Sequence, residues 1–426
     1  MGGTLYLSAI TYPVTATVVI SHAITIIGMG YGTFITGDPG NAPLITVNGA
    51  SGVNLEGIRV QNTHVPLSGQ NSYVNVWFDN ASNSEVYSCW FTGGRIAADI
   101  TGGSYITIDN NVMTGLIDSA VAANSNSSYL TISHNRIYGT VTSSDPGPPH
   151  DINLEDASYS TISNNLIVET ATGFIQPESS GIQLATNHNP SLTNDTIINN
   201  VLQHAVGGTE NVGIIISGKP GINFYNVNVS NNVISNFFTG ITYGEATPNN
   251  VVIQGNHVEQ FGTSGIYATS SANGTGSTVN APSFTIAANH LAGATSSPGN
   301  GTGLRVLLWS NVTVQDNQVY DAGKSGISFE GVQSSSLSGS IVYDNSQSST
   351  GVFSGISLLP SAGNVAASNN SISRTITYDD EQVPMQRYGI YVSTGSSNNT
   401  LSGTQAWGNV IAGIEDEGTG TIITYP

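Results

Sequence analysis

Acidic side chains gather between residues 99 and 178 of this 426-residue sequence. We predict Asp99, Asp118, His150, Asp151 and Glu178 as catalytic candidates, because their spacing brings them to one edge of the same face. Two carboxyl groups beside a glycosidic bond can hydrolyse it, one as the acid for the leaving oxygen and the other as the base for water. Repulsion from Asp118 would raise the pKa of a neighbouring carboxyl and so supply the acid. A solvated acidic edge, or a calcium site built from its oxygens, is the alternative, and no other cofactor is expected.

Polar and aromatic side chains that alternate with apolar ones supply a second set of candidates. Amides, carboxylates and guanidinium groups bond to sugar hydroxyls, and aromatic rings stack on sugar rings. The residues predicted to contact a substrate are Asn153, Glu155, Asp156, Gln183, Tyr267 and Arg305. Any solvated sheet face carries such residues, so an ordinary surface is the alternative. Of the four tryptophans that could stack on sugars, Trp90 and Trp407 fit packing roles better because they adjoin the repeated corner described next.

A repeated pattern, seen in "YITIDNNVMTG", "LTISHNRIYG" and "VNVSNNVISN", positions these residues. Apolar residues lie three and five positions before an asparagine, which is the alternation of a half-buried strand. Asparagine suits the sharp corner that follows, because it tolerates left-handed backbone and its amide can bond to the amides of stacked coils. The spacing averages about 29 residues, which indicates stacked repeats. The predicted register comprises Asn62, Cys89, Asn111, Asn135, Asn165, Asn200, Asn232, Asn256, Asn289, Asn317, Asn345, Asn370 and Asn409.

A second family of short strands, such as "SGIQLAT", "TGITYGE" and "SGISFEG", precedes each corner. Repeated short strands with identical turns predict parallel pairing between successive coils. The predicted fold is therefore all-β: a single right-handed parallel β-helix, or solenoid, of about 13 coils with an Asn ladder. Its predicted parts are an N-terminal cap with the first coil (1–36), the β-helix (37–413) and a C-terminal cap (414–426). If Asp99 and Asp151 hold the same place two coils apart, about 9–10 Å separates them, near the upper limit for inverting hydrolysis.

The chain resembles the pectin-lyase-like superfamily of right-handed parallel β-helices over almost its whole length. Its opening, "GGTLYLSAITYPVTATVVISHAITIIGMGYGTFI", resembles the capping start of those proteins. The resemblance implies activity on one parallel face, in a groove walled by loops, but the superfamily spans lyases, hydrolases, C5-epimerases, tailspikes and adhesins. No subfamily catalytic motif matches. "PPHD" (148–151) is similar to an element of alginate C5-epimerases, yet it has Pro148 in place of the first Asp and precedes Ile152 where that motif follows a strand.

The composition of the chain argues against several classes of binding partner. The net charge is −19 with only eight Lys and Arg, which argues against nucleic acid and against polyanionic substrates. No apolar run approaches the roughly 20 residues of a membrane-spanning helix, and no signal peptide precedes Gly2. Cys89 is the sole cysteine, so it forms no intrachain disulfide and is expected to be a buried spacer. Nine Asn-x-Ser/Thr sequons and few charges are typical of an extracellular, secreted or virion-surface protein.

Two functions fit these observations. The first is a secreted carbohydrate-active protein that hydrolyses or otherwise processes a polysaccharide in a groove along the parallel sheet. A glycoside hydrolase fits better than a polysaccharide lyase or a C5-epimerase, because lyase chemistry on uronates needs clustered cations. The second is a non-catalytic adhesin or tail-fibre-like rod that binds cell-surface glycans. The partner is a polysaccharide or glycan in both cases, and a homotrimer is one assembly that the sequence allows.

Overall fold

Most strands bury the apolar half of an alternating segment. In β13 (Ser104–Asp109), Ile106 and Ile108 are buried, and the next coil repeats the pattern in β16 (Thr131–Ser133) with Ile132. Parallel pairing aligns Ile108 with Ile132, and Ile162 and Ile197 continue that row on the next two coils. Stacked aliphatic side chains of the same kind therefore fill the interior, coil upon coil.

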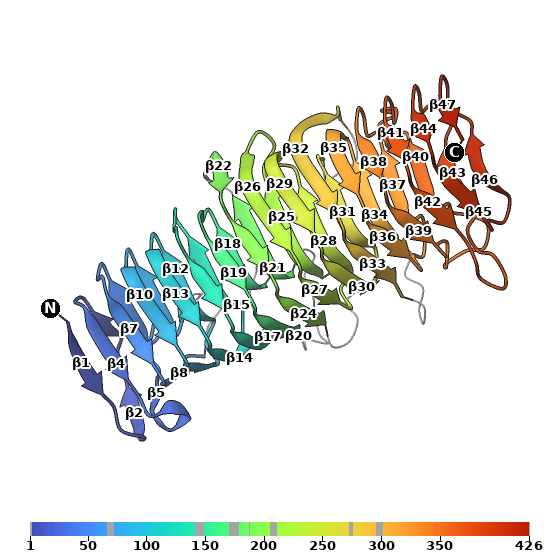
Figure 1. The fold of residues 1–426 in the computed structure, drawn as a ribbon. Coiled ribbons are helices and arrows are strands. Elements are labelled where there is room, and N and C mark those ends of the chain that lie inside the picture. The colour runs from blue at the N-terminus through green and yellow to red at the C-terminus, as the bar shows by residue number, and fades with distance from the viewer. Residues whose placement is uncertain are drawn as a thin grey trace. The chain divides into compact units, whose positions relative to one another are not determined.

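The computed structural model describes residues 2–65, 72–140, 149–169, 179–186, 188–204, 211–271, 276–294 and 301–425. The chain divides into two compact units, unit 1 (Met1–Val206) and unit 2 (Gly207–Pro426). Within each unit, three parallel sheets named A, B and C wind in the same order, as the successive coils of Figure 1 show. The described residues contain a single 3-10 helix, η1 (Gly30–Gly32), and no helix long and apolar enough to cross a membrane.

The strands of unit 1 fall into three sheets. Sheet A contains β1 (Gly3–Tyr6), β4 (Ile24–Ile27), β7 (Val53–Glu56), β10 (Ser82–Tyr87), β13, β16, β19 (Thr161–Ser163), β22 (Ser191–Thr193) and β23 (Thr196–Ile198). Sheet B contains β2 (Thr11–Val14), β5 (Phe34–Gly37), β8 (Arg59–Asn62), β11 (Trp90–Thr92), β14 (Val112–Leu116), β17 (Arg136–Thr140), β20 (Leu166–Glu169) and β24 (Val201–His204). Sheet C contains β3 (Val18–Ile20), β6 (Ile45–Asn48), β9 (Val76–Asp79), β12 (Ile96–Thr101), β15 (Ser119–Asn124), β18 (His150–Glu155) and β21 (Ser180–Thr186).

Unit 2 repeats the arrangement. Sheet A contains β26 (Asn223–Ser230), β29 (Thr247–Gln254), β32 (Val279–Ala287), β35 (Trp309–Gln315), β38 (Ser336–Ser338), β41 (Ser371–Ser373), β44 (Thr400–Ser402) and β47 (Ile422–Thr424). Sheet B contains β27 (Val233–Ser235), β30 (His257–Phe261), β33 (His290–Gly293), β36 (Gln318–Tyr320), β39 (Ile341–Tyr343), β42 (Ile376–Tyr378) and β45 (Gln405–Trp407). Sheet C contains β25 (Val212–Gly218), β28 (Thr239–Gly244), β31 (Ser264–Thr269), β34 (Thr302–Leu307), β37 (Ile327–Glu330), β40 (Ile356–Leu359), β43 (Tyr388–Val392) and β46 (Ala412–Asp416).

These strands give eight described coils in unit 1 and seven in unit 2, counted on sheet B, against the expected 13 or so. The sequence count started at Asn62, but the coils of β2 and β5 precede that residue. The predicted cap boundaries, 1–36 and 414–426, stay a prediction.

Buried asparagines bond to one another at the corner between sheets A and B. In unit 1 the Nδ2 atom of Asn111 donates to Oδ1 of Asn135, and Asn135, Asn165 and Asn200 continue the chain at distances of 2.9–3.0 Å. In unit 2, Asn232, Asn256, Asn289 and Asn317 form an equivalent row at 3.0 Å. The left-handed backbone belongs to the residue before each ladder asparagine, for example Asn110 (φ 57°) and His134 (φ 53°), and not to the ladder residue itself.

Several residues of the predicted register lie elsewhere. In unit 1, Ile58 and not Asn62 holds the corner position, while Cys89 holds it as predicted and donates its backbone N–H to Asn111. Burial raises the pKa of the Cys89 thiol to about 12, which suits a spacer and not a nucleophile.

In unit 2 the row continues after Asn317 with hydroxyl residues, so the predicted Asn345, Asn370 and Asn409 are wrong for this corner. Asn317 donates its backbone N–H to Ser340, and the strand register carries the position on to Thr375 and Thr404. Asn370 bonds to Asn399 at the corner before sheet A. Asn345 and Asn409 both bond to Gln386 at the corner after sheet B. Side-chain amides therefore form hydrogen bonds at three corners of the coil: before sheet A, between sheets A and B, and after sheet B.

Asp195 occupies the corner before β23 and is buried. Its Oδ1 atom accepts a hydrogen bond from the Ser160 backbone, and Oδ2 has no hydrogen-bond partner among the described residues. Burial raises the pKa of this carboxyl well above its ordinary value. The folded chain therefore keeps a proton on Asp195 that the unfolded chain releases above about pH 4. Its contribution to stability therefore falls as pH rises.

Replacing Asp195 by asparagine is expected to raise the thermal unfolding temperature at pH 8 by several degrees, and by less at pH 4, where the carboxyl is protonated anyway. Asn370 and Asn399 hold the equivalent corner in unit 2 and donate Nδ2 to backbone carbonyls, so an amide fits. Calorimetry at both pH values checks this, with the exposed Asp316→Asn as the matched control. A lower unfolding temperature for Asp195→Asn at pH 8 would contradict it.

Candidate functional site

The outward face of sheet C in unit 1 carries several of the predicted site residues in one row. Parallel pairing aligns Trp77 of β9 with Asp99 of β12, and Ala122, Asn153 and Gln183 follow on the next three coils. Adjacent coils lie about 4.8 Å apart, so this row offers one polar or aromatic side chain at nearly every step.

Asp99 lines a pocket of about 150 Å³ at the start of this row. The Trp77 indole forms another wall, packs against Val74 and donates its N–H to the Thr101 hydroxyl at 3.0 Å. These contacts fix the orientation of the indole beside the carboxyl group of Asp99. Pro43 and Ser72 complete the lining.

Burial raises the pKa of Asp99 to about 6, and the charge of Asp118 adds to this while the nearby Arg95 opposes it. The Oδ1 atom of Asp99 is buried without a hydrogen-bond partner among the described residues. Arg95 instead pairs with Asp118 at 2.6 Å, and the Asp118 backbone N–H donates to the Arg95 carbonyl. The site therefore combines a carboxyl group that holds a proton near pH 6 with a carboxylate paired to a cation, which is an arrangement suited to acid–base chemistry.

Asp151 lies closer to the strand start than the predicted register requires. Asn153, two residues later, is the residue aligned with the Asp99 row, so Asp151 is two coils and two residues away from Asp99. The expected 9–10 Å separation becomes a backbone separation of about 12 Å. Asp151 is almost completely buried.

The structure buries His150 instead of placing it in the outward row. His150 lies two residues before Ile152, so its side chain points to the same inward side of the strand. Its Nδ1 atom lies 2.8 Å from the Ser180 hydroxyl. Burial lowers the pKa of His150 to about 4, so the ring is a neutral core residue at pH 7. Glu178, the remaining catalytic candidate, lies outside the described residues.

Glu155, Asp156 and His188 form the group of the described chain that could hold a metal ion, with one ligand atom from each within 4.8 Å of the others. They line a pocket of about 510 Å³ with Asn124, Ser125, Asn126 and Asn189. Asp156 already accepts hydrogen bonds from the Thr186 hydroxyl, two backbone N–H groups and the His188 ring. Burial raises the pKa of Asp156, but these bonds outweigh it and lower the pKa to about 2. This carboxylate thus organises its loop without an ion, and the calcium alternative stays a prediction.

The two other predicted contact residues belong to unit 2. Arg305 lies beside Tyr267 on sheet C, with its guanidinium 5.2 Å from the ring centroid. Glu330 binds Arg305 through two hydrogen bonds of 2.8 and 2.7 Å, which raise the pKa of the guanidinium. The Arg305 charge is therefore neutralised locally, and Tyr267, Arg305 and Glu330 form a cluster within unit 2.

Arg95 is the site residue that the sequence analysis missed. It opens the segment "RIAAD", which ends at Asp99. Opposite charges four residues apart are a signal in a chain with only 8% charged residues. Among the tryptophans, Trp309 is fully buried, Trp407 stacks on Tyr378 at 5.1 Å and Trp90 contacts Tyr31 edge to face at 6.0 Å. Trp77 is therefore the one beside the candidate site.

The fold and this outward row define a parallel β-helix protein with a row of polar and aromatic side chains on sheet C of unit 1. The family model described as "right handed beta helix region" matches residues 43–226 and 279–425, and the chain belongs to that family. This confirms the predicted fold. A comparison with curated protein sequences gives no match.

Similar solved structures come from phages and bacteria. The tailspike protein of E. coli bacteriophage HK620 in complex with pentasaccharide is 12% identical, with a TM-score of 0.58, and the alignment covers 100% of this chain and 74% of that chain. A mutant of the same tailspike in complex with hexasaccharide gives a TM-score of 0.57 at the same identity and coverage. The A-module of a mannuronan C-5 epimerase from Azotobacter vinelandii is 13% identical, covering 100% of this chain and 91% of that chain with a TM-score of 0.32. At this identity, the tailspike likeness is one of fold.

Proposed function

We propose that this protein binds a polysaccharide along sheet C of unit 1 and hydrolyses it, with Asp99 as the general acid. The observation that carries this proposal is the buried Asp99 carboxyl, whose pKa is raised to about 6 beside the Trp77 ring and the Arg95–Asp118 ion pair. A carboxyl that holds its proton up to about pH 6 and a second carboxylate are the two groups that glycoside hydrolysis needs.

In the proposed reaction, Asp99 gives its proton to the glycosidic oxygen as the bond between that oxygen and the anomeric carbon breaks. A water molecule adds to the anomeric carbon, and its proton passes through solvent to the carboxylate of Asp118, which pairs with Arg95 and lies one coil and four residues from Asp99 in the strand register. The net change is the addition of one water molecule. Trp77 offers an aromatic wall for one sugar ring, and Asn153 and Gln183 offer amides to the hydroxyls of the following units.

The charge of the chain supports a neutral or weakly charged substrate. The chain has 8 Lys and Arg residues against 27 Asp and Glu residues. Of the basic residues, Arg95 and Arg305 are already paired with carboxylates. The tailspikes named above were solved with oligosaccharides bound, which supports a glycan partner and a place on a virion or outside the cell. A homotrimer stays a prediction.

A polysaccharide panel at pH 4 to 8 tests the proposal through two measurements: new reducing ends and absorbance at 235 nm. Hydrolysis gives reducing ends without the absorbance, whereas a lyase gives both. The matched variants are Asp99→Asn and, as the control outside the site, Glu415→Gln. Reducing ends that persist in Asp99→Asn would contradict the role of Asp99. Glycan binding without cleavage by the wild type would instead favour the adhesin or tail-fibre-like rod.

A further inference from the structure

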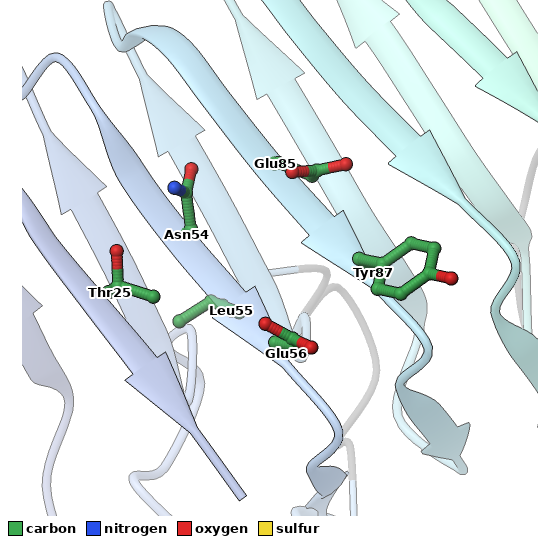
Figure 2. A pocket seen from close by; sticks show the side chains of 6 residues that line it. All are labelled: Thr25, Asn54, Leu55, Glu56, Glu85 and Tyr87. Atoms are coloured by element: carbon green, nitrogen blue, oxygen red, sulfur yellow. The ribbon is translucent and has the colours of Figure 1, made fainter. Parts of the chain in front are cut away.

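A second pocket lies on a different face of unit 1, on the outward side of sheet A. It has a volume of about 290 Å³, and Figure 2 shows the six residues around it, from β4, β7 and β10: Thr25, Asn54, Leu55, Glu56, Glu85 and Tyr87. Parallel pairing aligns Thr25, Asn54 and Glu85 in one row and Glu56 with Tyr87 in the next. Three adjacent coils therefore contribute polar side chains to one hollow.

The polar side chains of this pocket have free hydrogen-bonding capacity. Within the described parts of the chain, no hydrogen bond or ion pair engages the side chains of Thr25, Asn54, Glu56, Glu85 or Tyr87. The next coil differs, because Asp109, which follows Tyr87 in its row, accepts bonds from Ser133 and His134 at 2.7 and 2.8 Å. An amide, two hydroxyls and two carboxylates are thus left for an external partner.

The pocket is also negatively charged, and the described residues place no cation beside its carboxylates. Glu56 and Glu85 lie on neighbouring coils, offset by two residues, so their backbones are about 8 Å apart. Arg59, three residues after Glu56, directs its guanidinium over the rings of Phe34 and Tyr31, 4.1 and 4.6 Å from their centroids. A ligand that places a positive charge between the two carboxylates would relieve their repulsion.

We propose that this pocket binds a saccharide unit that carries a free amino group. The ammonium would lie between Glu56 and Glu85, and the sugar hydroxyls would bond to Asn54 and Thr25. Tyr87 is 38% exposed and adds a phenol hydroxyl and an aromatic surface of the kind that sugar rings pack against. This site is independent of the proposed hydrolysis on sheet C, so either can fail without the other.

Calorimetric titration with a glucosamine tetrasaccharide, and with its N-acetylated counterpart as the uncharged control, tests this site at about 150 mM salt, where long-range attraction is screened. We expect the N-acetylated ligand to bind at least tenfold more weakly. The double variant Glu56→Gln/Glu85→Gln and the single variant Tyr87→Ala should each weaken binding of the amino form at least tenfold. Glu415→Gln removes one carboxylate from unit 2 and should leave the affinity unchanged.

Equal affinity for both ligands, no binding, or equal losses in the pocket variants and in Glu415→Gln would each overturn the proposal. Displacement of the saccharide by stoichiometric calcium would also overturn it and identify a cation site. Because all three pocket positions lie on the solvent face of the sheet, thermal unfolding of the variants should match the wild type, which separates loss of binding from loss of folding.

Discussion

Replacing Asp99 by asparagine is expected to lower the turnover of the polysaccharide by about 10²–10⁴-fold, the usual contribution of a general acid. Asparagine keeps the shape of the side chain but has no proton to transfer, so glycan affinity should change by less than tenfold. Initial rates and a binding isotherm on the same polysaccharide separate the two effects. Equal losses of turnover and affinity would indicate that Asp99 only holds the substrate.

The same group predicts the pH dependence of the reaction. An acid with a pKa of about 6 holds its proton below pH 6, so the rate should fall as pH rises through that value. The positive charge of Arg95 lowers the pKa of Asp99, so removing Arg95 should move the fall in rate to higher pH. A rate profile that is flat between pH 5 and 8 would contradict the assignment.

Asp99→Asn should change the stability of the fold in the direction opposite to its effect on turnover. The folded-state pKa of Asp99 is raised above its unfolded value, so the carboxyl makes the fold less stable as pH rises from about 4 to about 6 and above. Asp99→Asn is therefore expected to raise the free energy of unfolding at pH 7 by about 1–3 kcal/mol, from 1.4 kcal/mol for each pKa unit. A merely structural carboxylate would give a loss. Denaturant unfolding at pH 4 and 7 distinguishes the two outcomes.

The fold could be predicted from the sequence because its interior repeats. Ile108, Ile132, Ile162 and Ile197 stack directly on one another, so the spacing of apolar residues in the chain equals one coil. The ladder in the middle coils follows for the same reason. It could not be followed to the C-terminus, because buried polar residues at three corners include asparagine, and the sequence alone does not tell Asn370 from Asn317.

The candidate site was predicted less completely because it depends on single residues. His150 and Asp151 are adjacent, and a strand directs adjacent side chains to opposite faces, so a shift of one residue decides which of them can reach a substrate. The segment "PPHDINLED" does not by itself show which side chains point inward. The structure shows it, because Ile152 is buried. Asp99 was predicted from the spacing of acidic residues, but its raised pKa comes from burial beside Trp77, which that spacing does not reveal.

Replacing Asn135 by alanine is expected to produce a large loss of stability in unit 1. Its Nδ2 atom donates to the Ile108 carbonyl at 2.8 Å and to Asn165 at 3.0 Å, and its Oδ1 atom accepts from both the backbone and the side chain of Asn111. Alanine would leave buried polar groups without partners on the two neighbouring coils, and each such group costs about 1–3 kcal/mol. The expected decrease in the free energy of unfolding is about 3–6 kcal/mol, measured by denaturant titration of the full chain.

Asn135→Ser is the matched comparison, because the chain itself uses serine at this corner. Ser340 accepts the backbone N–H of Asn317 at 3.2 Å, so a hydroxyl can replace the amide as acceptor but cannot reach both neighbours. The serine variant should therefore lose about half as much as alanine. A decrease below about 1 kcal/mol for alanine would mean that water or backbone movement satisfies the exposed partners, and that the ladder aligns the coils without stabilising them. If serine and alanine lost equally, the acceptor would contribute nothing, and the stabilisation would come from the amide donor alone.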